Sequence, residues 1–395
     1  MVRYWVWGAL CILSAAVLGC GQSTLDPSAL DTAAGVTETE IRIGSSLALG
    51  GHAGYLGTQM LQGAMSYIRA VNDNGGIHGR QIRLIAKDDR YDPTICLFNT
   101  QQLILREKVF CLFSYVGTPT TVRIIPLINE AEIPLLGMFT GANRLREPAN
   151  PLLINVRASY YQEIEAAVTH IVRKRGLNRV AVFYQYDEYG FDGLRGTEIA
   201  LKQYDLKPVA KGTYVRGTLD VEQGLDHIRH SGAQAVVMIG TYDSCAKFIR
   251  LAKEKNYSPL FYSVSFVGAS ELARRLGRIG QGVLVTQVVP PPWAESTGRT
   301  LPGIQKYIDD LTAYYPDARP SFVGLEGHIN ARILAAALER AGRDLTRRKF
   351  ISAIESIRSF DLGIEHTISF GRGDYQGLDR VYFTKIHKGR LVLIP

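Results

Sequence analysis

From residue 41 onwards the chain alternates between two patterns, and this alternation restricts the possible folds more than any other feature. Short runs rich in β-branched and aliphatic residues predict strands, and the stretches between them have helical periodicity. The first set predicts strands at 41–47, 82–85, 109–113 and 133–136 and helices at 55–72, 93–106 and 120–131. Strands that alternate with helices of this length form parallel sheets with right-handed crossovers. We therefore expect an α/β fold.

The alternation then begins again. A second set predicts strands at 180–184, 209–214, 235–239, 260–264 and 283–288, with helices at 161–175, 193–204, 221–230, 244–255 and 269–276. Mostly helical sequence follows at 301–357, and strand-like runs follow at 367–370, 380–386 and 391–394. We expect two doubly wound parallel-sheet lobes joined by three crossover segments. The predicted lobes are 40–157 plus 289–371 and 158–288 plus 372–395, with a cleft between them.

The N-terminal segment predicts export. A basic start is followed by an apolar run at 4–18, which is shorter than the roughly 20 residues that a transmembrane helix needs. The run ends in Val17-Leu18-Gly19-Cys20, which resembles the lipobox of bacterial lipoproteins. We expect a signal peptide at 1–19, lipidation of Cys20 and a flexible tether within 20–39. The alternative is a cysteine placed by chance in an ordinary signal peptide or in a membrane span.

Composition excludes some partners. The net charge is +8, but the lysines and arginines are scattered rather than clustered, so nucleic acid binding is not indicated. Beyond Cys20 the chain has Cys96, Cys111 and Cys245, which we expect to be buried small hydrophobic residues. A disulfide between Cys96 and Cys111 is the alternative. No Cys/His spacing predicts a metal site.

Five motifs occur in order along the chain. They are the IRIG segment at 41–44 with the glycines at 50–51, NDNGGIHGR at 72–80, DDRYDP at 88–93, SYVGTPTT at 114–121, and the pair RASY at 157–160 and DEYG at 187–190. With these motifs, the chain over 40–395 resembles the exported leucine/isoleucine/valine-binding proteins, which are type I periplasmic binding proteins of ABC transporters. The resemblance implies two lobes that close on a small solute, without a cofactor.

One of these motifs also indicates a binding site on physical grounds. Gly117-Thr118-Pro119-Thr120 follows a predicted strand and opens a predicted helix. Free backbone N–H groups at a helix start, together with the hydroxyls of Thr118 and Thr120, are suited to a carboxylate or another anion. Open parallel sheets place ligands at such loops.

The resemblance implies further binding positions on both lobes. Each tyrosine among them could also be an ordinary half-buried aromatic residue, since the chain has 20 tyrosines. The implied positions are Tyr55, Gly117, Thr118, Phe139 and Thr140 on the first lobe and Tyr189, Tyr242 and Ser265 on the second.

Ser265 marks a departure from the family pattern. In amino-acid-binding members an acidic residue near the end of the 260–264 strand pairs with the ammonium group of the solute. Here that segment reads Ser263-Val264-Ser265-Phe266, without an acid. A buried ammonium group without a carboxylate partner is costly. Asp243 could substitute, but a carboxylate, amide, urea-like or aromatic acid solute fits equally well.

No motif predicts an enzyme, because the chain contains no GxSxG, HExxH or Walker A sequence. We expect a monomeric receptor, held by its lipid to a membrane and facing the periplasm or the cell exterior. It would bind a small polar solute, such as a branched-chain amino acid or a related carboxylate or amide. It would present this solute to the permease and ATPase subunits of an ABC importer. The alternative is a sensory module that signals to a membrane kinase without transport.

Overall fold

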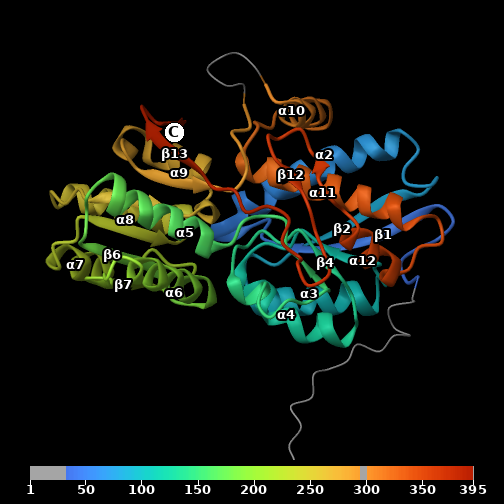
Figure 1. Cartoon of the computed structure of the whole chain (residues 1–395), viewed down its shortest axis with the longest axis horizontal. Coiled ribbons are helices and arrows are strands. Elements are labelled where there is room, and N and C mark those ends of the chain that lie inside the picture. The colour runs from blue at the N-terminus through green and yellow to red at the C-terminus, as the bar shows by residue number, and fades with distance from the viewer. Residues whose placement is uncertain (1–32, 294–299, 395) are drawn as a thin grey trace, which may run out of the picture.

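Two separate β-sheets, each with helices packed on it, form two lobes that lie side by side (Figure 1). The computed structural model describes residues 33–293 and 300–394. The predicted signal peptide at 1–19, Cys20 and most of the predicted tether lie outside the described residues. The α/β architecture with two sheets confirms the predicted fold class.

The first lobe contains a five-stranded parallel sheet with the order β2-β1-β3-β4-β5. The four predicted strands are all present, and the sheet adds β5, which is too short to show a sequence period. The strands are β1 (Glu40–Leu47), β2 (Gln81–Asp88), β3 (Cys111–Phe113), β4 (Leu135–Leu136) and β5 (Leu153–Ile154). The helices between them are α2 (Gly54–Asp73), α3 (Pro93–Leu105) and α4 (Thr118–Glu130).

Late helices complete this lobe. They are α10 (Pro302–Tyr314), α11 (Phe322–Ala341) and α12 (Arg347–Glu355), followed by the short strands β11 (Phe360–Asp361) and β12 (Thr367–Ile368). Helix α11 packs directly on α2 (Figure 1). A Cβ on Gly63 of α2 would lie 1.8 Å from the carbonyl oxygen of Gly324 on α11. The two helices therefore touch backbone to backbone.

The second lobe contains a seven-stranded mixed sheet with the order β14-β13-β10-β9-β8-β6-β7. The two C-terminal strands are antiparallel, and the others are parallel. The strands are β6 (Val180–Gln185), β7 (Lys211–Tyr214), β8 (Ala235–Ile239), β9 (Leu260–Ser263), β10 (Leu284–Gln287), β13 (Tyr382–His387) and β14 (Arg390–Ile394). The helices are α5 (Tyr160–Thr169), α6 (Glu188–Lys202), α7 (Glu222–His230), α8 (Tyr242–Glu254) and α9 (Ala269–Leu276), with a short turn η4 (Ser265–Val267) after β9.

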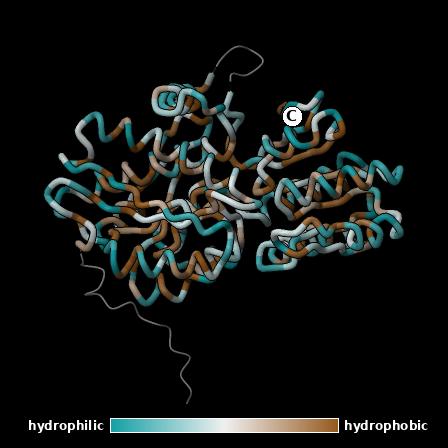
Figure 2. The backbone as a smooth tube through the Cα atoms, turned by 180° about the vertical axis from the view of Figure 1, so that it is seen from behind, coloured by the Kyte–Doolittle hydropathy of each residue, from teal (hydrophilic) through white to brown (hydrophobic). Residues whose placement is uncertain are grey.

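Hydropathy follows this layering. Hydrophobic residues run through the interior of both lobes, whereas the outer segments carry alternating hydrophilic and hydrophobic residues (Figure 2). Strand β8 is buried at every position, as expected for a central parallel strand with helices on both faces. Burial of these apolar faces is the main force that holds each lobe together.

The chain crosses between the lobes at three places. The first follows β5 and the second follows β10. Before the third, the N–H of Asn155 donates to Tyr375, and the N–H groups of Gly377 and Leu378 donate to Asn155 and Val156. The tail therefore runs with the first lobe past the predicted boundary at 371 and as far as Leu378.

The three cysteines of the described residues are buried and free. This confirms that Cys96, Cys111 and Cys245 act as small hydrophobic residues, and it excludes the alternative disulfide. Within 33–293 and 300–394, no group of three or more metal-ligating side chains is assembled. No helix in the same ranges is long and apolar enough to cross a membrane.

Candidate functional site

The two lobes meet along a buried interface, and the predicted site residues of both lobes lie on it. From the second lobe, Phe266 reaches across and packs against Tyr91 and Phe139 of the first. The backbone N–H of Asn143 donates to the carboxylate of Asp192 on α6 at 3.1 and 3.2 Å. The lobes are thus closed on each other, with the loops at the carboxyl ends of the first sheet facing the second lobe.

The start of α4 supplies one end of the site. The hydroxyls of Thr118 and Thr140 are hydrogen-bonded at 2.7 Å and are buried. Gly117 has a φ of 106°, and a Cβ there would lie 2.1 Å from the ring of Tyr91, so only glycine fits. Its N–H donates to the carbonyl of Phe139 at 3.1 Å. The Thr118 and Thr140 pair is therefore the polar feature that this end offers.

Two details of the predicted anion site are wrong. The hydroxyl of Thr120 donates to the carbonyls of Val116 and Gly117 at 2.7 and 3.0 Å, so it is used within its own helix. The N–H of Gly117 is also used, as described above. The hydroxyl of Tyr160 lies instead beside Thr118 and Thr140, where burial raises its pKa to about 12. It would remain a protonated donor at any physiological pH.

Five aromatic side chains fill the centre of the interface, and we call them the Phe266 cluster. They are Phe266, Tyr91, Phe139, Tyr160 and Tyr189. The Phe266 ring stacks on Phe139 with centroids 5.3 Å apart, and it lies 4.7 Å from Tyr189. All five residues are at most 1% exposed. Two of them, Phe139 and Tyr189, are predicted site residues, and they come from different lobes.

A second aromatic pair lies at the start of α2 and α8. The backbone N–H of Tyr55 donates to the hydroxyl of Tyr242 at 3.4 Å, and the two rings meet edge to face at 6.1 Å. Asp243, the predicted substitute acid, is ion-paired with Arg275, whose guanidinium also lies 4.9 Å over the Tyr242 ring. Asp243 is therefore already paired, and the hypothesis that it replaces the absent acid is not supported.

An acidic side chain from another helix, Glu163 of α5, lies beside Ser265. The carboxylate of Glu163 on α5 accepts hydrogen bonds from the Ser265 N–H at 2.8 Å, from its hydroxyl at 2.9 Å and from Thr286 at 2.6 Å. The guanidinium of Arg157 contacts the same carboxylate at 3.3 Å and also donates to the Ser265 hydroxyl. Glu163 is completely buried, and these donors compensate its charge.

Arg157 joins this polar group to the aromatic cluster. Its side chain is 2% exposed, and its guanidinium lies 4.7 Å over the Phe139 ring. A second ion pair links it to Glu326 on α11, with 3.6 Å between Nη1 and Oε2. Burial alone would lower the pKa of Arg157, but the attraction of Glu326 and Glu163 raises it overall. Arg157 is therefore a permanent cation between the lobes.

Sequence reasoning did not assign the central residues of this interface. Tyr91, Arg157, Tyr160 and Phe266 all lie within segments that the sequence analysis quoted, so their position next to predicted site residues was a usable signal. Glu326 lies on α11 in a sequence that is apolar or small on both sides, Gly324-Leu325 and Gly327. A charged residue in such a run is itself a sign of a specific partner.

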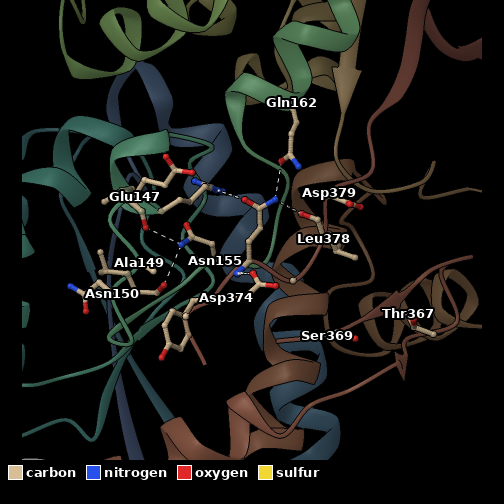
Figure 3. A pocket seen from close by; sticks show the side chains of 17 residues that line it. Glu147, Ala149, Asn150, Asn155, Gln162, Thr367, Ser369, Asp374, Leu378 and Asp379 are labelled. Atoms are coloured by element: carbon tan, nitrogen blue, oxygen red, sulfur yellow. Dashed lines mark hydrogen bonds between the residues drawn. The ribbon is translucent and has the colours of Figure 1, made fainter. Parts of the chain in front are cut away.

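The chain also has a separate cavity of about 550 Å³ beside the crossover segments (Figure 3). Gln376 is one of its lining residues, and its side chain accepts from Arg146 at 2.9 Å and donates to Gln162 at 2.8 Å. The other lining residues come mainly from 145–155 and 367–379, and none of the eight predicted site residues lines it. We call it the hinge cavity. It is a different region from the interface described above.

Comparison with known proteins agrees with this geometry. The model of a family described as "Periplasmic binding protein" matches residues 40–390. The chain belongs to the periplasmic binding protein family. Members of this family bind solutes outside the cytoplasm, so the family implies an extracytoplasmic location and a role in binding rather than catalysis.

Individual relatives are distant in sequence but close in fold. The chain is 23% identical over 329 residues to "Leu/Ile/Val-binding protein homolog 7" of Brucella abortus, covering 80% of this chain and 81% of that protein. It is 24% identical to an "Amino acid binding protein" of Pseudomonas aeruginosa, covering 72% and 75%. A solved structure of a possible leucine/isoleucine/valine-binding protein from Rhodopirellula baltica has 33% identity and a TM-score of 0.86, covering 92% of this chain and 98% of that one.

Proposed function

We propose that the chain is a lipid-anchored extracytoplasmic receptor for a small solute, which it presents to an ABC importer. The solute would carry a carboxylate or amide group and would lie between the lobes. Unsatisfied polar groups at the interface are the observation that carries this proposal. The hydroxyl of Tyr189 and two nitrogens of Arg157 are buried there without a hydrogen-bond partner among the described residues.

Such groups indicate a missing partner. Leaving one buried donor unsatisfied costs about 1–3 kcal/mol, so native proteins rarely keep several of them together. A polar solute between the lobes would supply acceptors for these donors. The hydroxyls of Thr118 and Thr140 and the nearby hydroxyl of Tyr160 would hold its carboxylate or amide.

Solute entry would require the lobes to part. The Phe266 ring fills the space between Phe139 and Tyr189, so a solute could reach Thr118 only when the ring has moved away. Closure would then be driven by the preference of the solute for the closed state, as in other two-lobed receptors. The closed lobes would form the surface that the permease recognises.

Membrane attachment through Cys20 is the second part of the proposal. The sequence that ends in Cys20 supports it, and export fits the location that the family implies. Mass spectrometry of the protein purified from membranes should find the mature chain beginning at an acylated Cys20. A Cys20→Ala variant should lose the lipid and leave the membrane fraction, and an unchanged distribution would overturn the anchor.

Thr118→Ala tests the site. A soluble form lacking Cys20 is screened by thermal shift against small carboxylates and amides, and the affinity of each stabilising solute is measured by calorimetry. We expect Thr118→Ala to weaken binding about fivefold, because one hydrogen bond contributes about 1 kcal/mol.

Thr197→Ala is the matched control, since the hydroxyl of this buried helix threonine donates to the carbonyl of Gly193 on the same helix, α6, and to no other group of the described residues. The melting temperature without solute should be similar in both variants. Equal affinity of Thr118→Ala and the control would remove Thr118 from the site.

A further inference from the structure

The charged side chains at the interface do not balance. Arg157 supplies one positive charge to two carboxylates, those of Glu163 and Glu326. Glu163 has four donors around it, as described above. The next cation, Arg146, interacts with Glu163 and with Asp192 rather than with Glu326. One buried carboxylate is therefore left with incomplete compensation.

Glu326 is that carboxylate. Its side chain is 7% exposed, and among the described residues it forms one ion pair, to Arg157 Nη1 at 3.6 Å, which is too long for a hydrogen bond. Burial raises its pKa to about 7, with Arg157 acting against the rise and Glu163 adding to it. Among the described residues, Arg157 and Glu163 are the charged groups that act on Glu326.

The neighbouring donors indicate that the solute also carries acceptor oxygens. Nε and Nη1 of Arg157 and the hydroxyl of Tyr189 have no hydrogen-bond partner among the described residues, although both side chains are almost completely buried. The guanidinium of Arg157 lies 4.7 Å from the Phe139 ring and also contacts Glu326. Arg157 is therefore the residue that connects Glu326 to the space that the proposed solute would occupy.

We infer that Glu326 is the charge partner of a cationic group on the solute. Such a solute would be a zwitterion, with its ammonium group at Glu326 and its carboxylate at the Thr118 and Thr140 hydroxyls. The inference rests on the proposed function and assigns the residue that replaces the acid missing at Ser265. The replacement comes from the other lobe, on α11 rather than after β9.

A purely anionic solute fits the region around Arg157 and Glu326 less well. A solute that carries only a carboxylate would give acceptors to the Arg157 donors, but it would also add a third negative charge beside Glu163 and Glu326 with no cation to offset it. An ammonium group would instead bring the local charge to zero. Its hydrogens would also fill the acceptor sites that Glu326 leaves open.

Matched pairs of solutes test the inference. The probes are L-leucine with 4-methylpentanoate and L-phenylalanine with 3-phenylpropanoate, where the second member lacks only the amine. Calorimetry is performed on the soluble chain, on Glu326→Gln and on Glu132→Gln, a control that changes a buried glutamate outside the interface. Glu326→Asp, which keeps the charge, is the second variant in case Glu326→Gln folds poorly.

We expect at least one amine-bearing member to bind about tenfold more tightly than its partner in the wild type and in Glu132→Gln. In Glu326→Gln this margin should disappear, and in Glu326→Asp it should persist in part. The margin in the wild type should widen from pH 6 to pH 8, because Glu326 loses its proton across this range and attracts a cation more strongly.

Equal affinity within the pairs, or an intact margin in Glu326→Gln, would overturn the inference while leaving the proposed function in place. Tighter binding of the amine-free acids would do the same. If none of the four probes raises the melting temperature, the solute class proposed for the receptor is wrong, and the role of Glu326 falls with it.

Discussion

The hinge cavity has the open volume expected of a binding site but, within the described residues, no unsatisfied polar groups at Gln376. The lobe interface has unsatisfied polar groups, although aromatic side chains fill it. The hinge cavity is open, about 550 Å³ in volume, and polar, yet Gln376 in its lining is hydrogen-bonded to both Arg146 and Gln162. The interface is filled by aromatic rings, yet it holds donors without acceptors and a carboxylate with incomplete compensation. The hinge cavity is thus distinguished by its volume, and the lobe interface by its unsatisfied polar groups.

This difference teaches that an empty space is not the best indicator of function in a two-lobed receptor. When the lobes close, the site shrinks to the size of its solute or is filled by neighbouring side chains. In the proposed function, the feature that then marks the site is a set of polar atoms whose partners are absent among the described residues. Substitutions in the two regions should therefore differ strongly in their effects.

Arg157→Met should have the largest effect on stability. The change keeps much of the side-chain volume but leaves the carboxylates of Glu163 and Glu326 buried without their counter-charge. Breaking a buried ion pair in this way costs about 3–5 kcal/mol. Urea unfolding monitored by circular dichroism measures the loss, and a loss below about 1 kcal/mol would show that Arg157 does not hold the lobes together.

Phe266→Ala should follow, with a loss of about 3 kcal/mol, because the ring is fully buried among four other rings and leaves a cavity behind. Phe191→Ala is the matched control, since Phe191 belongs to the same lobe but is 44% exposed. Its loss should stay within about 0.5 kcal/mol. If the two variants unfold at the same urea concentration, the cluster is not a packed part of the closed state.

Gln376→Ala should have the smallest effect. It removes the side-chain hydrogen bonds to Arg146, Gln162 and Leu378 in the hinge cavity, where water can replace the lost partner. The expected loss is about 1 kcal/mol in the same urea assay. A loss larger than that of Phe266→Ala would reverse the ranking of the two regions.

Most of the fold could be predicted from the sequence, because parallel strands buried on both faces are continuous apolar runs. Strand β8 has its predicted bounds, and β1 begins one residue before them. The start of α6 was predicted at 193 but lies at Glu188. The side chain of Asp187 accepts from the Tyr189 N–H at 3.1 Å and caps the helix before its apolar pattern begins.

The candidate site was predictable only in part. The Gly117-Thr118-Pro119-Thr120 motif predicted Thr118, because it follows a strand, where parallel sheets place their ligands. Phe139 and Ser265 were implied by the family resemblance alone. The role of Glu326 was not predictable, because it depends on contacts between α11 and a crossover segment far away in the chain. The occupied hydroxyl of Thr120 was also invisible, since its partners are carbonyls of its own backbone.

The glycine contact between α2 and α11 has a mechanical consequence. Because the backbones touch at Gly63 and Gly324, the helices have no room at this point for side chains that could rearrange and let one helix slide on the other. Tyr55 at the start of α2 and Glu326 on α11 are therefore parts of one rigid jaw. In the proposed function, Tyr55 and Glu326 would approach the solute together when the lobes close. The distance between them would stay constant and would limit the length of the solute.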